Sequence, residues 1–207
     1  SEIIADAVAG AVSVAYSSDS TSISLGLGVV RAINKIKTSV HAVINNSILN
    51  VGGALSMNAS NNGAKIWALA VTVSASVAFS GGGCSLSASG AGAETNNDIY
   101  TEILATVTGG SLVTMTNQGN VTLTGQDNAD IQAVTTAAAA GLAIAGDSSF
   151  GGTISVGISL STNNIGQRSD ANLIKAGVDG STIENAGGIS LTASTASPIK
   201  AYVFAIA

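Results

Sequence analysis

Small and large residues alternate along much of this chain with a period of two. In IWALAVTVSASVAF, Ile66 to Phe79, one set of alternate positions is mostly Ala, Thr and Ser, and the other is mostly Trp, Leu, Val and Phe. A period of two is typical of β-strands, because successive side chains point to opposite faces. Turn-forming clusters such as SSDSTS, SGGG and GDSSFGG follow these segments, and a second alternating segment comes next. The pattern predicts an all-β protein.

The alanine-rich stretch from Asp130 to Gly146, DIQAVTTAAAAGLAIAG, tests this prediction. Helix propensity alone would favour a helix there, since Ala is the best helix former. The stretch aligns with two other alternating segments, however, so we predict a strand. A face of Ala, Gly and Ser lets two sheets approach more closely than the roughly 10 Å of ordinary sheet packing. We therefore expect a flattened coil whose Ala/Gly/Ser faces meet, while the larger faces contact another sheet or another copy.

The alternating segments recur as a repeat of about 66 residues. Successive units cover about 1–63, 64–128 and 129–197, and 198–207 begins a fourth, so the whole chain reads as one repetitive domain. Repetition on this scale predicts a stacked architecture, here a parallel β-solenoid, or β-helix. Four isoleucines mark equivalent positions and are expected to form an aliphatic stack: Ile3, Ile66, Ile131 and Ile199.

Asparagines also recur, in the segments AINKI, TNNDI and TNNIG. This alignment places Asn34, Asn97 and Asn164 in register. In a solenoid the three side chains would form an amide ladder at a bend, each bonded to those above and below. Three independent Asn turns are the alternative, because Asn tolerates left-handed backbone.

Charge is sparse and unclustered. Charged residues are 9% of the chain, the net charge is −5, and the seven basic residues are scattered. A nucleic-acid surface needs clustered Lys and Arg, so no nucleic-acid partner is expected. The uncharged run from Ile66 to Ala93 is long enough to span a membrane, but its alternation and Gly/Ser content favour strands, so no membrane span is predicted.

Candidate catalytic chemistry is nearly absent from the sequence. His41 is the only histidine and Cys84 the only cysteine, which rules out a multi-histidine metal site and an internal disulfide. Asp127 and Asp130 are the closest carboxylate pair, and a solvated corner explains them better than glycosidase chemistry. We predict a non-enzymatic protein without cofactor or metal.

The chain begins inside one unit and stops inside another, without a polar cap. Open solenoid ends expose unpaired backbone groups, so we expect an uncapped segment of a longer chain or fibre. Its main partner would then be itself, through end-to-end or lateral stacking.

Units of the form IxAxAxAxA, a Gly/Ser turn, SxGxSxxxNxI and GGxIxLxA resemble those of giant repetitive bacterial surface proteins. These include filamentous adhesins and autotransporter-type leukotoxins with β-solenoid stalks. The resemblance covers essentially the whole chain. It implies secretion, an extracellular or cell-surface location, and structural or adhesive work.

Three functions follow in order of preference. The first is a self-stacking segment of an extracellular fibre, sheath or stalk. The second is an adhesin module that binds glycans or another cell surface through turn loops such as GDSSFGG. The third is a β-helix carbohydrate-active enzyme.

Overall fold

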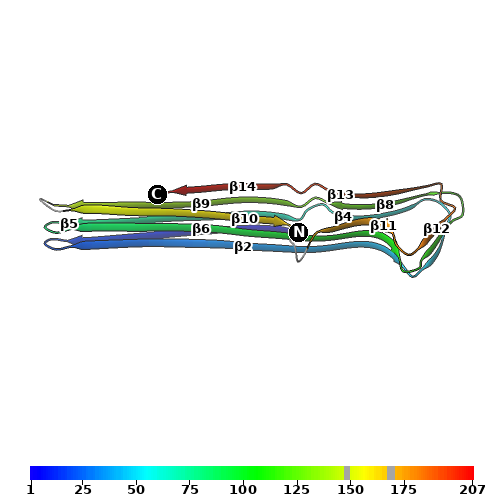
Figure 1. Ribbon diagram of the computed structural model, residues 1–207, viewed down its shortest axis with the longest axis horizontal. Helices are drawn as coiled ribbons and strands as arrows, with labels where there is room; N and C mark the ends of the chain where they lie inside the picture. The colour runs from blue at the N-terminus through cyan, green and yellow to red at the C-terminus, as the bar shows by residue number, and fades with distance from the viewer. Residues whose placement is uncertain (147–149, 167–170) are drawn as a thin grey trace.

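The computed structural model describes residues 1–146, 150–166 and 171–207. Within these ranges the chain forms fourteen strands and no helix, and every pairing between strands is parallel (Figure 1). The all-β prediction is confirmed, including a strand at the alanine-rich stretch. The strands are β1 Glu2–Ser17, β2 Ser22–Asn45, β3 Ile48–Val51, β4 Leu55–Asn61, β5 Lys65–Ser80, β6 Ser85–Thr108, β7 Leu112–Met115, β8 Asn120–Asp127, β9 Asp130–Ala145, β10 Gly151–Ile165, β11 Leu173–Val178, β12 Thr182–Glu184, β13 Gly188–Thr195 and β14 Ile199–Ile206.

The chain runs in circuits, and each circuit lies beside the previous one. After β1, β2, β3 and β4, the next strand, β5, pairs with β1 rather than with its neighbour in sequence. Four parallel sheets result: sheet A (β1-β5-β9-β14), sheet B (β2-β6 followed by β10 and β11), sheet C (β3-β7-β12) and sheet D (β4-β8-β13). Parallel neighbours need such crossovers, because a tight turn can join only antiparallel strands.

Equivalent isoleucines lie side by side across sheet A. Ile3 pairs with Ile66, Ile66 with Ile131, and Ile131 with Ile199. In sheet B, β6 continues for 24 residues, whereas its neighbour in the third circuit is divided into β10 and β11.

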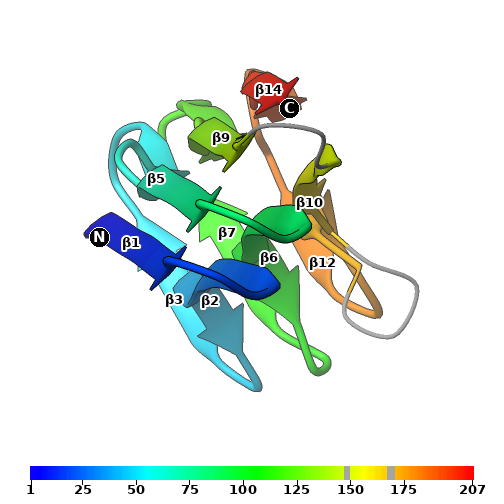
Figure 2. The same cartoon turned by 90° about the vertical axis from the view of Figure 1, so that its left-hand side faces the viewer.

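One end of the molecule is a flat part made of two layers. Sheet A packs on the first portions of β2, β6 and β10, and the β1–β2 and β5–β6 turns lie together at this end (Figures 1 and 2). Side chains between the layers are small: on β5, Ala68, Ala70, Thr72, Ser74 and Ser76 are all buried. The alternating pattern places small residues inside and large residues outside.

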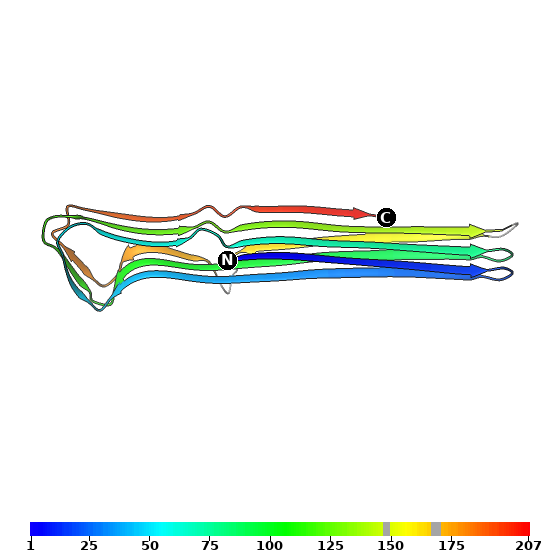
Figure 3. The same cartoon turned by 180° about the vertical axis from the view of Figure 1, so that it is seen from behind.

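The other end is a wide part with a more usual core. There the strands of sheets B, C and D lie around one another (Figure 3). They enclose buried side chains that include Ile103, Met115 and Leu123. The outward positions of sheet D are polar, for example Ser56 and Thr122. The same strands β2 and β6 therefore have small buried residues in the flat part and larger ones in the wide part.

The flat part has large apolar side chains on both outer surfaces. On sheet A, Val12 is 80% exposed and Tyr16 78%, and on sheet B, Ile154 is 69% exposed. No helix of the described residues is long and apolar enough to cross a membrane.

Candidate functional site

The most connected group of polar side chains is a ladder of three amides inside sheet B. Asn34 Nδ2 donates to Asn97 Oδ1 at 2.7 Å, and Asn97 Nδ2 donates to Asn163 Oδ1 at 2.7 Å. Asn163 Nδ2 then donates to Ser161 Oγ at 2.9 Å. Each amide has a donor and an acceptor, so one residue can bond to the circuits on both sides. Asn34 and Asn97 are buried, where such bonds are costly to lose.

The predicted third member of this ladder, Asn164, was wrong by one residue. Asn163 pairs with Asn97, while Asn164 pairs with Asp98 and donates from Nδ2 to Asp98 Oδ1 at 2.8 Å. A slip of one residue in a strand moves the side chain to the opposite face of the sheet. Asn164 therefore belongs to the outward row of sheet B.

The predicted position of the ladder at a bend was also wrong. Asn34 and Asn97 lie inside the 24-residue strands β2 and β6. They stack close to the isoleucine row, because Ile66 and Ile131 are buried in one cluster with Ile36 and Ile99. At the edges of sheet A, Ile3 is half-buried and Ile199 is 45% exposed. The amides and isoleucines together fill the transition between the flat and wide parts.

A second polar ladder, which sequence reasoning missed, lies at the end of sheet D. Asn61 Nδ2 donates to Asp127 Oδ1 at 2.7 Å, and Asn128 Nδ2 donates to Asn62 Oδ1 at 2.9 Å. Asp127 is fully buried, so its expected place in a solvated corner was wrong. The recurrence of adjacent polar residues in ASNN and QDNAD was the sequence feature that could have predicted this second ladder.

Hydroxyl groups link the two layers of the flat part. Ser24 Oγ donates to Ser13 Oγ at 3.0 Å, and Ser76 Oγ and Ser87 Oγ are 2.7 Å apart. The layers are so close at Gly26 that an added Cβ would lie 2.7 Å from the carbonyl oxygen of Ala75. Small side chains are therefore a steric requirement at this level.

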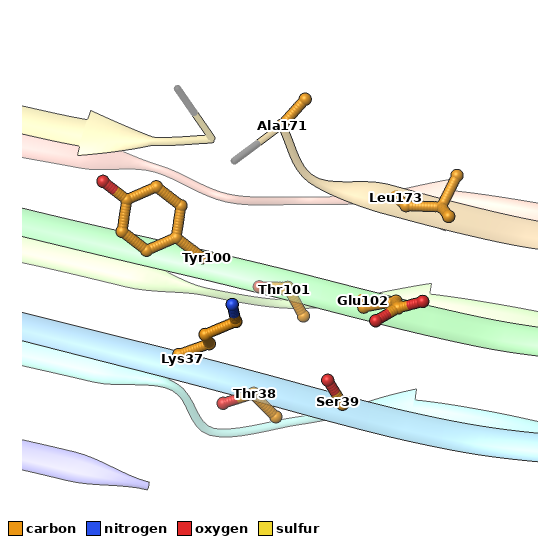
Figure 4. Close-up of a pocket in the computed structure, with 8 residues that line it drawn as sticks. All are labelled: Lys37, Thr38, Ser39, Tyr100, Thr101, Glu102, Ala171 and Leu173. Carbon is orange, nitrogen blue, oxygen red and sulfur yellow. The ribbon is translucent and has the colours of Figure 1, made fainter. Parts of the chain in front are cut away.

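A shallow polar depression of about 200 Å³ lies on sheet B where β10 ends and β11 begins (Figure 4). Lys37, Tyr100 and Glu102 supply its ionisable groups, and Leu173 closes one side. Hydroxyl groups also line it, from Thr38, Ser39 and Thr101. The ammonium of the nearby Lys35 is 4.5 Å from the centre of the Tyr100 ring. Among the described residues, those that line the depression include neither a cysteine nor a histidine, although His41 Nε2 lies 3.6 Å from Glu102 Oε1. The described lining offers hydrogen-bonding groups and a single carboxylate, that of Glu102.

Residues suited to metal or thiol chemistry are dispersed. In the described ranges no three His, Cys, Asp or Glu side chains gather in a way that could hold a metal ion. Cys84 is exposed in the turn before β6. Of the GDSSFGG loop, residues 147–149 lie outside the described residues, so its predicted glycan binding stays a prediction.

Comparison of the chain with protein-family models, with curated proteins and with solved structures finds no match. The function is therefore inferred from the geometry of the ladders and surfaces.

Proposed function

We propose that this chain is a structural, non-enzymatic segment of a β-solenoid that stacks with itself in an extracellular or cell-surface fibre, sheath or stalk. In this proposal each circuit is one coil of about 66 residues, flattened in the flat part by facing Ala, Gly and Ser. The extracellular location follows the resemblance of the repeats to those of giant bacterial surface proteins.

The observation that carries the proposal is the ladder of Asn34, Asn97 and Asn163. Identical side chains lie in register and bond from circuit to circuit, which is the arrangement of cross-β stacks. Such a row adds one bond for each added coil. The Ile3, Ile66, Ile131 and Ile199 row repeats the relationship with apolar side chains. A protein whose side chains repeat along one axis is suited to length and stiffness rather than to a single site.

The residue types also favour structural work. Few charged groups are available to titrate, and the strand backbones bond in continuous rows along the stacking axis. Among the described residues, the polar depression beside Tyr100 has one carboxylate, Glu102, and no histidine or cysteine, whereas glycoside hydrolysis commonly uses paired carboxylates.

Electron microscopy and X-ray diffraction of the concentrated, purified chain test this proposal. We expect filaments with a reflection near 4.8 Å along the filament axis, the spacing of hydrogen-bonded strands. Particles that stay monomeric and globular at every concentration would count against self-stacking. Turnover of a polysaccharide by the homogeneous chain would count against a structural function.

A further inference from the structure

The two outer surfaces of the flat part both expose many large apolar side chains to solvent. Face A is the outward surface of β1, β5, β9 and β14, and face B is the outward surface of β2, β6 and β10. The large exposed side chains of face A are Ile4, Val8, Val12, Val14, Tyr16, Trp67, Val73, Leu142, Ile144, Tyr202, Phe204 and Ile206. Those of face B are Ile23, Leu25, Leu27, Val29, Ile33, Leu86, Ile154, Val156, Ile158 and Leu160.

Each face is large enough for a stable interface. Sheet A has four strands and β1 has 16 residues. At about 3.3 Å per residue and about 4.8 Å per strand, face A covers on the order of 900 Å², and two such surfaces reach the roughly 1,600 Å² of a standard interface. Monomeric proteins seldom expose apolar patches above about 600 Å².

Charges on the two faces are complementary when positions at the same distance along the strands are compared. Residues of the two layers are called level when they lie at the same distance from a contact that joins the layers. The Ser13–Ser24 hydrogen bond marks one level of the first circuit. Asp6 is seven residues from Ser13 and Arg31 is seven residues from Ser24, so both lie at one level on opposite faces. Glu2 and Lys35 are likewise eleven residues from Ser13 and Ser24. At both levels an acid of face A matches a base of face B.

The second circuit repeats this match with the signs reversed. The Ser76–Ser87 contact marks its level, and Lys65 and Asp98 are each eleven residues from it. No ion pair among the described residues involves Glu2, Asp6 or Lys65, whereas Arg31 Nε lies 3.0 Å from Glu94 Oε2 on the same face. Three pairs of opposite charge, at two levels, therefore match across the two faces.

The apolar portions of the faces coincide in the same way. Face B has an apolar hollow of about 490 Å³ that is lined by Leu25, Leu86, Ala88 and Ile154 among others. Val14 and Val77 of face A are one residue from Ser13 and Ser76, as Ile23 and Leu86 are from Ser24 and Ser87. Valines of face A are therefore level with the hollow of face B.

We propose that a second copy of this chain stacks on the first by simple translation, with its face A on face B and its strands in the same direction. Translation brings each level of one face onto the same level of the other, so apolar rows meet apolar rows and opposite charges meet. The inference rests on the proposed self-stacking function and specifies its lateral contact. Since the contact is heterologous, it leaves a free face on each side and can continue to further copies.

Symmetric contacts of face A with itself fit less well. Aligned sheet packing keeps the strands of the two sheets nearly parallel or antiparallel. A two-fold axis along the strands reverses the order of the circuits, so Asp6 of β1 would face the aromatic Tyr202 of β14 in the second copy. An axis across the strands lays the charged end of the face on its apolar end. Translation avoids both mismatches.

Two single variants and their mixture test the contact. Val71→Glu introduces a charge in the middle of face A, and Ala88→Glu introduces one in the hollow of face B. Thr122→Glu, on the polar outward surface of sheet D, is the matched control. Circular dichroism establishes that each variant retains its strands, and sedimentation velocity at several concentrations measures assembly.

We expect each face variant to lose lateral assembly alone, while their equimolar mixture forms a dimer through the one intact face that each retains. The control should assemble like the unmodified chain. If Ala88→Glu alone still pairs laterally, seen as filaments two chains wide by electron microscopy, face A binds itself, and if the mixture shows no lateral pairing, the faces do not bind each other; both results overturn the proposal. Unmodified filaments only one chain wide would overturn it too, while leaving the proposed function intact. Loss of the 4.8 Å reflection from the unmodified chain would instead contradict the proposed function.

The direction of stacking has its own measurement. In a Cys84→Ser background, a short bismaleimide should join chains carrying Asp6→Cys to chains carrying Arg31→Cys. Cross-links of Asp6→Cys chains to one another would show a symmetric contact and contradict translation. Flotation of the unmodified chain with phosphatidylcholine vesicles would assign the apolar faces to a lipid surface and overturn the proposal.

Discussion

Asn34 and Asn97 are 63 residues apart in sequence, yet the amide nitrogen of the first donates to the amide oxygen of the second at 2.7 Å. Both side chains are buried, and the amide nitrogen of Asn97 donates in turn to the amide oxygen of Asn163. Asn97 is thus the central member of the ladder and uses both its donor and its acceptor. Its replacement is the most direct test of what the ladder contributes.

We expect Asn97→Asp to destabilise the chain. The aspartate can still accept from Asn34, but its second oxygen would face Asn163 Oδ1 without a hydrogen to share. Leaving such a buried group unsatisfied costs about 1–3 kcal/mol, and more if it is charged. The free energy of unfolding, measured by urea titration with circular dichroism, should fall by about 1–3 kcal/mol or more.

The same substitution at an exposed asparagine is the control. Asn58→Asp, on the outward side of β4, should change the free energy of unfolding by less than about 0.5 kcal/mol. Equal effects at positions 58 and 97 would mean that the amide ladder does not stabilise the fold.

Gly26→Ala should also be destabilising, for a steric reason. The new Cβ would lie 2.7 Å from the carbonyl oxygen of Ala75, which is backbone and cannot rotate away. Overpacking of this kind typically costs about 1–3 kcal/mol. At Gly10 an added Cβ meets nothing within 4 Å, so Gly10→Ala should be neutral or slightly stabilising. Thermal melts of the two variants compare them, and a neutral Gly26→Ala would refute close packing of the layers.

The two parts of the molecule should respond differently to loss of an isoleucine side chain. Ile103 is fully buried in the wide part, so Ile103→Ala should cost about 2–5 kcal/mol. Ile23 is 68% exposed on face B, so Ile23→Ala should cost much less in dilute solution. Urea unfolding of the monomeric chain measures both. A large cost at Ile23 would indicate that face B is covered even in the monomer.

Asp6→Lys should weaken lateral assembly. It places a second cation level with Arg31 of the neighbouring copy. Exposed ion pairs contribute about 0.2–1 kcal/mol, and reversal adds a repulsion of similar size, so the dissociation constant should rise about 2- to 30-fold. Asp19→Lys, in the turn between β1 and β2, is the charge-matched control and should have little effect. Sedimentation equilibrium at low ionic strength gives both constants. An unchanged constant for Asp6→Lys would refute the Asp6 and Arg31 match.

The sequence was informative about strands and about the positions that lie side by side. A period of two predicted an all-β chain, and alignment of the repeats predicted Ile3, Ile66, Ile131 and Ile199 at one level, where the structure pairs them. These features could be predicted because alternation and repetition are properties of the chain itself. Helix propensity at the alanine-rich stretch was overruled by tertiary packing.

The sequence was less informative where two similar residues are adjacent. In TNNIG the alignment matched threonine with threonine and selected Asn164, although matching Ile165 with Ile99 and Ile36 would have selected Asn163. Ile165 is half-buried against the cluster that contains Ile36 and Ile99, and it fixes the register because a shift of one residue would turn it to solvent. The burial of Asp127 depends on Asn61 in the preceding circuit, and no local pattern reports such a distant partner.

The 24 paired residues of β2 and β6 determine how a stack of these chains would carry tension. Backbone hydrogen bonds between circuits point along the stacking axis, so a uniform pull on that axis is shared by the whole row at once. A pull applied at one edge instead loads the hydrogen bonds one after another, so that they break in sequence. Such a fibre would be strong in extension and would fail by peeling from an edge.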